Sequence, residues 1–378
     1  MELIRFEIQD IDVFGQGISK IGGKTAFIPK TLIGEQGSAR VIKEKKSYLI
    51  AQAVEIDVKS PDRVESACPH YDQCTGCHYL HYSYEDEISF KKKALKNHMR
   101  KLVSDDEFDK IIQVFPDVER FNYRNRIQLH YQKNESLLGQ YSTSLKKNIP
   151  TPECKLADKL IQNRVEQIYN TAGVGEFLKK ARKKEGHVEI LLTPDNKVTI
   201  HFDKQYSSGG FTQVNQRANR VLLDFLGLSF RTHFKENDPV QIIDLFGGSG
   251  NLTKNLANSK CYVVDSFIKK ESLSTHQIPI VMNLFKKGML GTLAQKIENK
   301  PELMIVDPPR SGFKEFSLLV ESIAPQMIYY ISCNPSTLAR DLENLMDFYQ
   351  IESISLFDFF PATHHFETFV ILKAYEQY

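Results

Sequence analysis

The chain beyond about residue 206 predicts an α/β fold in which helices cover both faces of a doubly wound, mostly parallel sheet. Two observations support this prediction. Short apolar runs recur along this part of the chain, and helix-length segments separate several of them. Strands that are apolar along their whole length are typical of a parallel sheet buried on both faces. The runs are residues 240–246, 261–264, 303–306, 327–331 and 369–372.

Residues 1–58 predict a small β-barrel that precedes this α/β unit. Apolar and polar positions alternate there, as they do in strands that have one buried face. Glycine-containing turn signals at 15–17, 22–24 and 34–37 divide the segment into short strands. Short strands at such spacing are typical of small barrels.

Residues 59–205 predict a second unit of mixed structure. Between about 59 and 90 the chain is rich in cysteine, proline and aromatic residues and has little periodicity. Alternation of apolar and polar residues returns at 124–131 and at 188–202, which predicts strands. We therefore expect three domains, with boundaries at 1–58, 59–205 and 206–378.

Length and composition agree with this organisation. The chain has 378 residues, of which 41% are hydrophobic and 25% are charged, as in ordinary globular proteins of two or three domains. Its apolar runs are far shorter than a membrane span, and its amino terminus resembles neither a secretory signal nor a transit peptide. We expect a cytoplasmic protein without a membrane partner, and no obligate protein partner is evident.

Positive charge is concentrated in the middle of the chain. The formal net charge is +2, but residues 85–184 contain 21 Lys or Arg against 14 Asp or Glu. Closely spaced basic residues at 91–101 and 179–184 are either a solvated surface or contacts for the phosphates of a nucleic acid.

Three of the six cysteines lie within ten residues. Five residues separate Cys68 from Cys74, two separate Cys74 from Cys77, and Cys154 is available as a fourth ligand. In a reducing compartment such a group favours metal binding over disulfides. Four thiolates serve tetrahedral zinc or a 4Fe-4S cluster, and the spacing does not decide between these two.

Residues 244–251 form a glycine-containing turn between a predicted strand and a helix. Such a turn brings backbone against a nucleotide cofactor. The dinucleotide fingerprint needs a third glycine where Thr253 stands, so NAD is disfavoured. The next predicted strand ends in Asp265, whose carboxylate suits a ribose diol. The alternative is a merely structural turn.

Two residues near the carboxyl terminus are candidates for catalysis. Cys333 follows a predicted strand and precedes Asn334 and Pro335, which suits a nucleophile better than a core thiol. Glu367 follows two histidines at the start of the last predicted strand and is a candidate general base. The alternatives are a buried thiol and an exposed glutamate at a strand start.

Together these motifs resemble the S-adenosylmethionine-dependent RNA uracil-5-methyltransferase family, over essentially the whole chain. The matching segments stand in the family's order and approximate spacing, and they are residues 211–215, 244–251, 307–310, 332–335 and 365–367. The chain is most similar to the 23S rRNA (uracil-5-)-methyltransferases. Its four clustered cysteines look like that branch's 4Fe-4S ligands, and residues 1–58 look like its RNA-binding TRAM domain, an OB-like β-barrel. The tRNA-modifying branch usually lacks both features.

The resemblance implies a role for each matching residue. Residues 59–205 would form a central iron-sulfur and RNA-binding domain, and residues 206–378 a Rossmann-like methyltransferase domain. Cys333 would be the nucleophile and Glu367 the base. The residues implied to contact S-adenosylmethionine are Gln213, Phe246, Asn251, Asp265, Asn283 and Asp307. Two positions depart from the family: Gly247 stands where cysteine is common, and Asp265 where glutamate is common.

The implied reaction gives 5-methyluridine through a covalent adduct between Cys333 and C6 of uracil. Other functions remain as alternatives. The same chemistry on tRNA fits these motifs, and so does a non-catalytic RNA-binding factor that has kept the fold. A DNA or small-molecule methyltransferase is a further alternative, although amino-group methylases prefer an aromatic residue where Arg310 stands.

Overall fold

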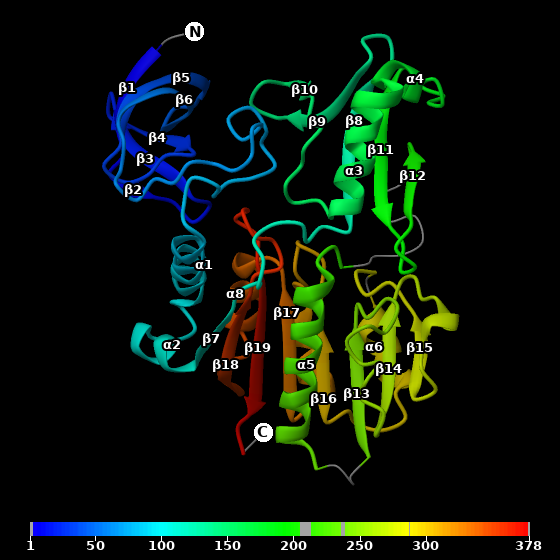
Figure 1. Ribbon diagram of the computed structural model, residues 1–378. Coiled ribbons are helices and arrows are strands. Elements are labelled where there is room, and N and C mark those ends of the chain that lie inside the picture. The colour runs from blue at the N-terminus through cyan, green and yellow to red at the C-terminus, as the bar shows by residue number, and fades with distance from the viewer. Residues whose placement is uncertain (1–2, 205–212, 236–238, 287, 377–378) are drawn as a thin grey trace.

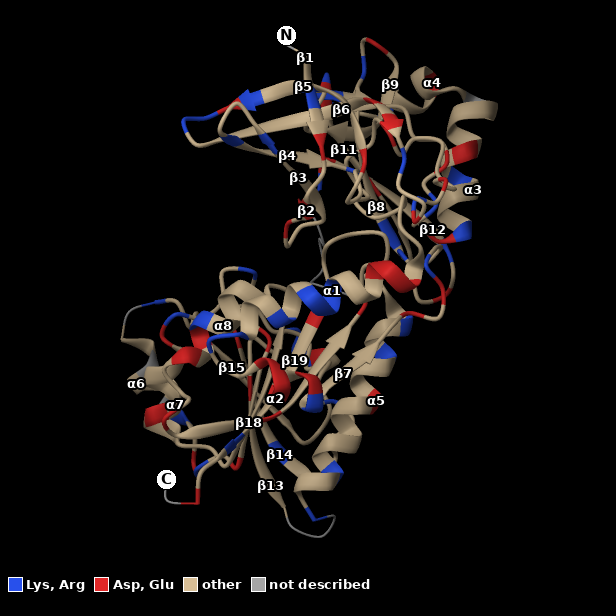
Figure 2. Ribbon diagram, turned by 90° about the vertical axis from the view of Figure 1, so that its left-hand side faces the viewer, with Lys and Arg blue, Asp and Glu red and all other residues tan. Residues whose placement is uncertain are grey.

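The computed structural model describes residues 3–204, 213–235, 239–286 and 288–376, and their strands form three sheets (Figure 1). In both Figure 1 and Figure 2, the two smaller sheets lie on the same side of a sheet of eight strands, beyond the ends of its strands. Within these described residues, none of the helices combines the length and the apolar character that crossing a membrane requires.

The eight-stranded sheet has the order β15-β14-β13-β16-β17-β19-β18-β7. Five strands from β15 to β17 pair in parallel, whereas β19 is antiparallel to both of its neighbours. The bounds are β7 Ile112–Phe115, β13 Val240–Leu245, β14 Ser259–Asp265, β15 Gln277–Val281, β16 Leu303–Val306, β17 Met327–Ser332, β18 Tyr349–Phe357 and β19 Glu367–Ala374. The predicted mostly parallel α/β sheet is therefore confirmed.

Helices cover both faces of this sheet, so its strands are buried on both sides. Alternate residues of β13 enter different cores: Ile242 packs with α5 on one face, and Ile243 packs with the other helices on the opposite face. These elements are α1 Tyr84–Met99, α2 Asp105–Ile111, α5 Gln216–His233, α6 Met289–Lys296, α7 Phe316–Ile323, α8 Pro335–Glu343 and the short 3-10 helix η2 Lys270–Ser272.

The segment 84–115, which the sequence analysis groups with the middle unit, lies against the eight-stranded sheet. Strand β7 pairs in parallel with β18 at the edge of that sheet. Leu95 and Met99 of α1 and Phe108 of α2 belong to the same apolar core as α7 and α8. The sequence of α1 does not reveal this packing, because the helix has many basic residues and its apolar stripe is narrow.

The amino-terminal residues form a six-stranded sheet of order β1-β5-β6-β4-β3-β2. Its core is small and includes Phe6, Ile28 and Leu49. At Gly37 the backbone of Glu55 lies so close that an added Cβ would stand 2.0 Å from the carbonyl oxygen. The bounds are β1 Leu3–Glu7, β2 Asp10–Ile11, β3 Gln16–Ile21, β4 Lys24–Pro29, β5 Gln36–Glu44 and β6 Tyr48–Val58.

The middle residues form an antiparallel sheet of order β10-β9-β8-β11-β12. Helices α3 and α4, with the π-helix η1 between them, pack on it around Leu129, Ile161 and Phe177. The bounds are β8 Arg126–Gln132, β9 Leu137–Ser142, β10 Lys147–Ile149, α3 Lys159–Gln167, η1 Ile168–Ala172, α4 Val174–Leu178, β11 Glu185–Leu192 and β12 Val198–Phe202.

The basic residues of α1 are largely engaged within the protein. Lys92 and Lys96 pair with Asp109 of α2 at 3.4 and 2.6 Å, and Lys101 lies 3.8 Å from Glu343. Figure 2 shows basic and acidic segments close together around these two helices. The positive charge of these three lysines is therefore partly offset by carboxylates of neighbouring segments, whereas Lys93 and Arg100 are exposed.

Lys91 is buried and joins α1 to the segment that leads into β19. Its ammonium is 2.6 Å from Glu87 and 2.8 Å from Asp358, and all three side chains are at most 1% exposed. Glu87 also accepts from the backbone N–H of Ala362 at 2.7 Å and pairs with Arg120 at 2.8 Å. Burial raises the pKa of Glu87. The network thereby fixes the segment 358–362 on the end of the large sheet.

Replacing Lys91 by Met should lower the free energy of unfolding by about 3–5 kcal/mol, because it leaves the buried Asp358 without a cation and Glu87 with Arg120 alone. Urea denaturation followed by circular dichroism measures this loss. Lys93→Met is the matched control, because Lys93 is exposed on the same helix, and it should change the free energy by less than about 0.5 kcal/mol. Equal effects of the two substitutions would contradict the account of the network.

Candidate active site and cysteine pocket

The carboxyl ends of the parallel strands face the two smaller sheets, and the predicted catalytic residues gather there. Figure 1 shows β19 running away from the smaller sheets, so its first residue lies at the same edge as the ends of β16 and β17. Ser332 pairs with Thr368 across β17 and β19, so Cys333 and Glu367 come together at the end of that pairing. Asp307 follows the adjacent strand β16.

Cys333 lines a cavity of about 330 Å³ at this edge. Burial raises the pKa of its thiol to about 12, the negative charge of Glu367 adds to the increase, and the guanidinium of Arg310 opposes it. The free protein therefore holds Cys333 as a thiol at neutral pH. A bound group that brings a positive charge would favour the thiolate, whereas further exclusion of water would oppose it.

Glu367 is 6% exposed and starts β19. Burial raises its pKa well above the ordinary value, and the nearby carboxylate of Asp307 raises it further. Burial also raises the pKa of Asp307, to about 7. A carboxylate with a raised pKa is a stronger base than an exposed one, as a group that removes a carbon-bound proton requires.

Arg310 connects several parts of this edge, although the sequence analysis assigned it no role. Its carbonyl oxygen accepts from the amide of Asn334 at 3.0 Å, and its guanidinium lies 3.4 Å from Nε2 of His365. The same guanidinium opposes the increase in the pKa of both Cys333 and Glu367. Its place directly after two prolines was the available signal, since Pro308 and Pro309 fix the direction of the chain.

The turn after β13 joins the ends of two neighbouring strands. Phe246 has φ of 62°, and the N–H of Gly248 donates to Asp265 at 3.1 Å, which joins the ends of β13 and β14. At Gly247 an added Cβ would lie 2.8 Å from the carboxyl group of Asp244 and from Val263. A side chain such as cysteine at this position would therefore require the side chains of Asp244 and Val263 to move.

The other predicted cofactor residues surround this turn. Asn251 donates to Asn219 of α5 at 3.1 Å, and Asn283 accepts from the N–H of Phe285 at 3.0 Å. The ring of Phe246 contacts that of Phe285 at a centroid distance of 5.4 Å.

Gln213 lies at the start of the described segment that leads into α5. Its carbonyl oxygen accepts from Asn125 at 3.0 Å, which ties it to the middle unit. Phe211 and Thr212, which belong to the same motif, lie outside the described residues.

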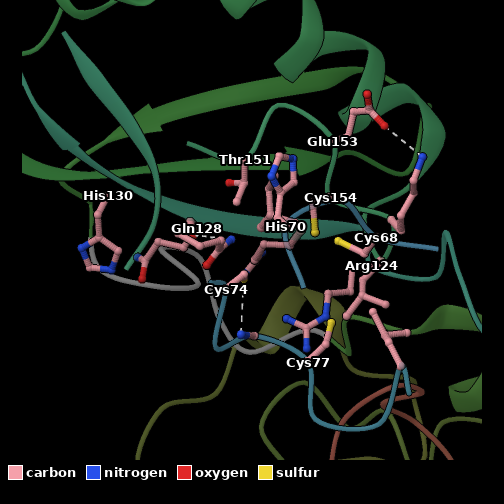
Figure 3. A pocket seen from close by; sticks show the side chains of 17 residues that line it. Cys68, His70, Cys74, Cys77, Arg124, Gln128, His130, Thr151, Glu153 and Cys154 are labelled. Carbon is pink, nitrogen blue, oxygen red and sulfur yellow. Dashed lines mark hydrogen bonds and ion pairs between the residues drawn. The ribbon is translucent and has the colours of Figure 1, made fainter. Parts of the chain in front are cut away.

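Cys68, Cys74, Cys77 and Cys154 line a second cavity, of about 270 Å³, between the cysteine-rich segment and the middle sheet (Figure 3). All four are free thiols. Burial raises the pKa of Cys68, Cys74 and Cys77, and repulsion from neighbouring cysteines raises it further. Among the residues that the structure describes, no group of three or more His, Cys, Asp or Glu is arranged to hold a metal ion.

Two cations stand beside the cysteine cavity. Arg124 lines it, and Figure 3 shows its guanidinium next to Cys77. Lys30 reaches it from the amino-terminal sheet and donates to the carbonyl oxygens of Tyr71 and, at 2.8 Å, of Cys74. These charges would stabilise thiolates in the cavity.

Comparisons with known proteins agree with this geometry. The family model described as tRNA (Uracil-5-)-methyltransferase matches residues 295–375, which include Cys333 and Glu367. A 23S rRNA (uracil(1939)-C(5))-methyltransferase of Shewanella woodyi is 26% identical over 98% of this chain and 96% of its own. An uncharacterized RNA methyltransferase of Bdellovibrio bacteriovorus is 28% identical over 98% and 95%.

A solved structure shares the fold. It is the Pyrococcus abyssi tRNA (uracil-54, C5)-methyltransferase in complex with S-adenosyl-L-homocysteine, with a TM-score of 0.71, 18% identity and coverage of 97% of this chain and 99% of that one. The large sheet is thus of the α/β methyltransferase type. With the end-to-end match to the curated relatives, these findings show that the chain is similar to RNA uracil-5-methyltransferases over nearly its whole length.

Proposed function

We propose that this protein methylates C5 of a uracil in 23S rRNA, with S-adenosylmethionine as the methyl donor. The observation that carries the proposal is the meeting of Cys333 and Glu367 at one strand edge, beside the turn at 246–250. The names of the curated relatives support a uracil in 23S rRNA as the substrate.

The chemistry explains why a thiol and a carboxylate are needed together. The thiolate of Cys333 adds to C6 of the uracil, and the electron density moves onto C5. C5 then takes the methyl group, for which the sulfonium of S-adenosylmethionine supplies the electrophile. Glu367 removes the proton from C5, the C5–C6 double bond forms again, and the thiolate leaves. The raised pKa of Glu367 suits this last step.

The residues around the turn after β13 are proposed to bind the donor. Asp265 would accept hydrogen bonds from the ribose, and Phe246 would offer its ring to the adenine. Asn251, Asn283 and Asp307 would contact the remainder of the donor, and Gln213 would close the site from the middle unit. The shared strand edge supports this set.

The target base has to leave the RNA stack, because C5 and C6 are covered in folded RNA. We propose that residues 1–58 act as a TRAM-like RNA-binding barrel next to the catalytic domain at 206–378. Residues 59–205 would act as the central domain, apart from the segment 84–115, which packs on the large sheet. Exposed basic residues at 179–184 in the middle unit are suited to phosphate. The same chemistry on tRNA is the second candidate, which the name of the matching family model favours.

We propose that the four clustered cysteines hold a 4Fe-4S cluster. A single zinc ion needs four sulfurs at about 2.3 Å from one point, whereas a cluster has a separate iron at each thiolate and holds the sulfurs further apart. The four thiols line one cavity, so each could bind one iron of a cluster there. The methyl transfer involves no net redox change, so these cysteines would stabilise the RNA-facing unit.

Cys333→Ala should abolish methyl transfer, because no thiolate remains to activate C5. Glu367→Gln should still transfer the methyl group but stay covalently bound to the RNA, because the C5 proton is not removed. Tritiated methyl transfer to unmodified 23S rRNA and denaturing gels measure the two effects. Glu321→Gln is the control, because Glu321 is exposed on α7. Normal turnover by Glu367→Gln would show that the base is another residue.

Cys74→Ser should remove the visible absorbance and the iron of anaerobically purified protein and should lower its thermal stability or RNA affinity. Cys333→Ala should keep the same absorbance, because Cys333 lies in the other cavity. Iron and sulfide counts with the visible spectrum test both variants. A wild-type protein that contains zinc and no iron would contradict the cluster.

A further inference from the structure

We infer that Phe14, on the turn between β2 and β3, forms a nucleobase subsite beside the Cys333 cavity and receives a base adjacent to the target uridine. The inference rests on the proposed function, since it concerns the RNA whose uracil Cys333 attacks. It identifies a residue of the amino-terminal sheet, 319 positions before Cys333 in the chain, as part of the catalytic pocket.

Phe14 stands at the mouth of the cavity that contains Cys333. It lines that cavity together with Arg310 and His364, and 51% of its surface is exposed. The cavity is therefore bounded by two different units, the amino-terminal sheet on one side and the end of the large sheet on the other. A base beside one that reaches Cys333 can therefore contact this ring.

The turn that carries Phe14 is held in a fixed conformation. The side chain of Asp12 accepts from the N–H groups of Phe14 and Gln16 at 2.9 and 2.8 Å. Gly15 has φ of 76°, and an added Cβ would stand 2.0 Å from the ring of Tyr79. The turn thus packs tightly on the cysteine-rich segment, and its backbone holds the Cα of Phe14 at the side of the cavity.

Phe14 continues a row of uncharged rings that leads to the reacting sulfur. The rings of Phe14 and His364 meet edge to face with their centroids 5.5 Å apart, and the ring centroids of His364 and His365 are 4.0 Å apart. Burial lowers the pKa of His364 to about 4 and that of His365 to about 3, so both rings are neutral at pH 7. Flat neutral rings beside a cation such as Arg310 are the surface on which bases stack.

A base next to the target fits this place better than the target itself. Phe14 is linked to Cys333 through His364, His365 and Arg310, so the base that the sulfur attacks lies beyond those rings. When the target uridine leaves its stack, its neighbour loses a stacking partner. Phe14 can replace that partner and so offset part of the cost of extruding the uridine.

The test is a binding cycle on the 23S rRNA fragment into which the wild-type protein transfers tritiated methyl. Phe14→Ala should weaken binding of this fragment by roughly 5- to 150-fold, the range for one base stacked on an aromatic residue. Phe14→Trp should bind within about twofold of wild type, since it keeps a ring. Val54→Ala is the matched control, because Val54 is 53% exposed on the same sheet.

An abasic nucleotide introduced on either side of the target uridine completes the cycle. One of these two nucleotides carries the base that stacks on Phe14. Removing that base should weaken binding to the wild-type protein by a similar factor, and it should not weaken binding to Phe14→Ala beyond the loss already caused by the substitution. The subsite would be overturned if Phe14→Ala bound the RNA as tightly as wild type. It would also be overturned if each abasic change weakened binding to Phe14→Ala as much as binding to wild type. Either result leaves methylation by the wild-type protein intact. If the wild-type protein methylates no uridine at C5, the proposed function fails and the subsite fails with it.

Discussion

The buried ammonium of Lys91 is the constraint on which the arrangement of the active site depends. It is held between Glu87 of α1 and Asp358 of the segment before β19, with all three side chains almost fully buried. Because a buried charge without partners is costly, α1 cannot separate from this segment without loss of stability. The same Glu87 fixes the backbone at Ala362, two residues before His364. The position of the segment 358–362, which leads to His364 and Glu367, is therefore set by a network that takes no part in the chemistry.

The reversed direction of β19 completes the site. A parallel strand at this position would carry its first residue to the opposite edge of the sheet, far from the strand ends where cofactors bind. Because β19 is antiparallel to β17, β19 starts with Glu367 next to the end of β17, directly before Cys333. The sheet thus brings the proposed nucleophile and base together, while the turns after β13 and β14 remain free to bind a donor. The cavity at this edge is also bounded by Phe14 of the amino-terminal sheet.

Much of this arrangement was predictable from sequence because it follows from local patterns. Apolar strands, a glycine turn and the strand-end position of Cys333 all leave local signals. The meeting of Cys154 with the cysteines at 68–77 has no local signal and was inferred from ligand number and resemblance. Phe14 gave no signal either, since a single exposed aromatic residue is common on surfaces. The ion pairs of Lys92 and Lys96 with Asp109 of α2 were not predictable, because they form only once the two helices pack. Strand β7 was missed for a similar reason, since its partner β18 is more than 200 residues away.

The central claim is that Cys333 forms a covalent bond to C6 of uracil during methyl transfer to C5. RNA that contains 5-fluorouridine tests it directly, because fluorine at C5 leaves no proton to remove and the adduct persists. Wild-type protein would be incubated with this RNA and S-adenosylmethionine, digested, and the cysteine-containing peptides analysed by mass spectrometry. The account predicts a methylated 5-fluorouridine adduct on the peptide that contains Cys333. An adduct on another cysteine, or methyl transfer to unmodified 23S rRNA with no adduct on the fluorinated RNA, would contradict it.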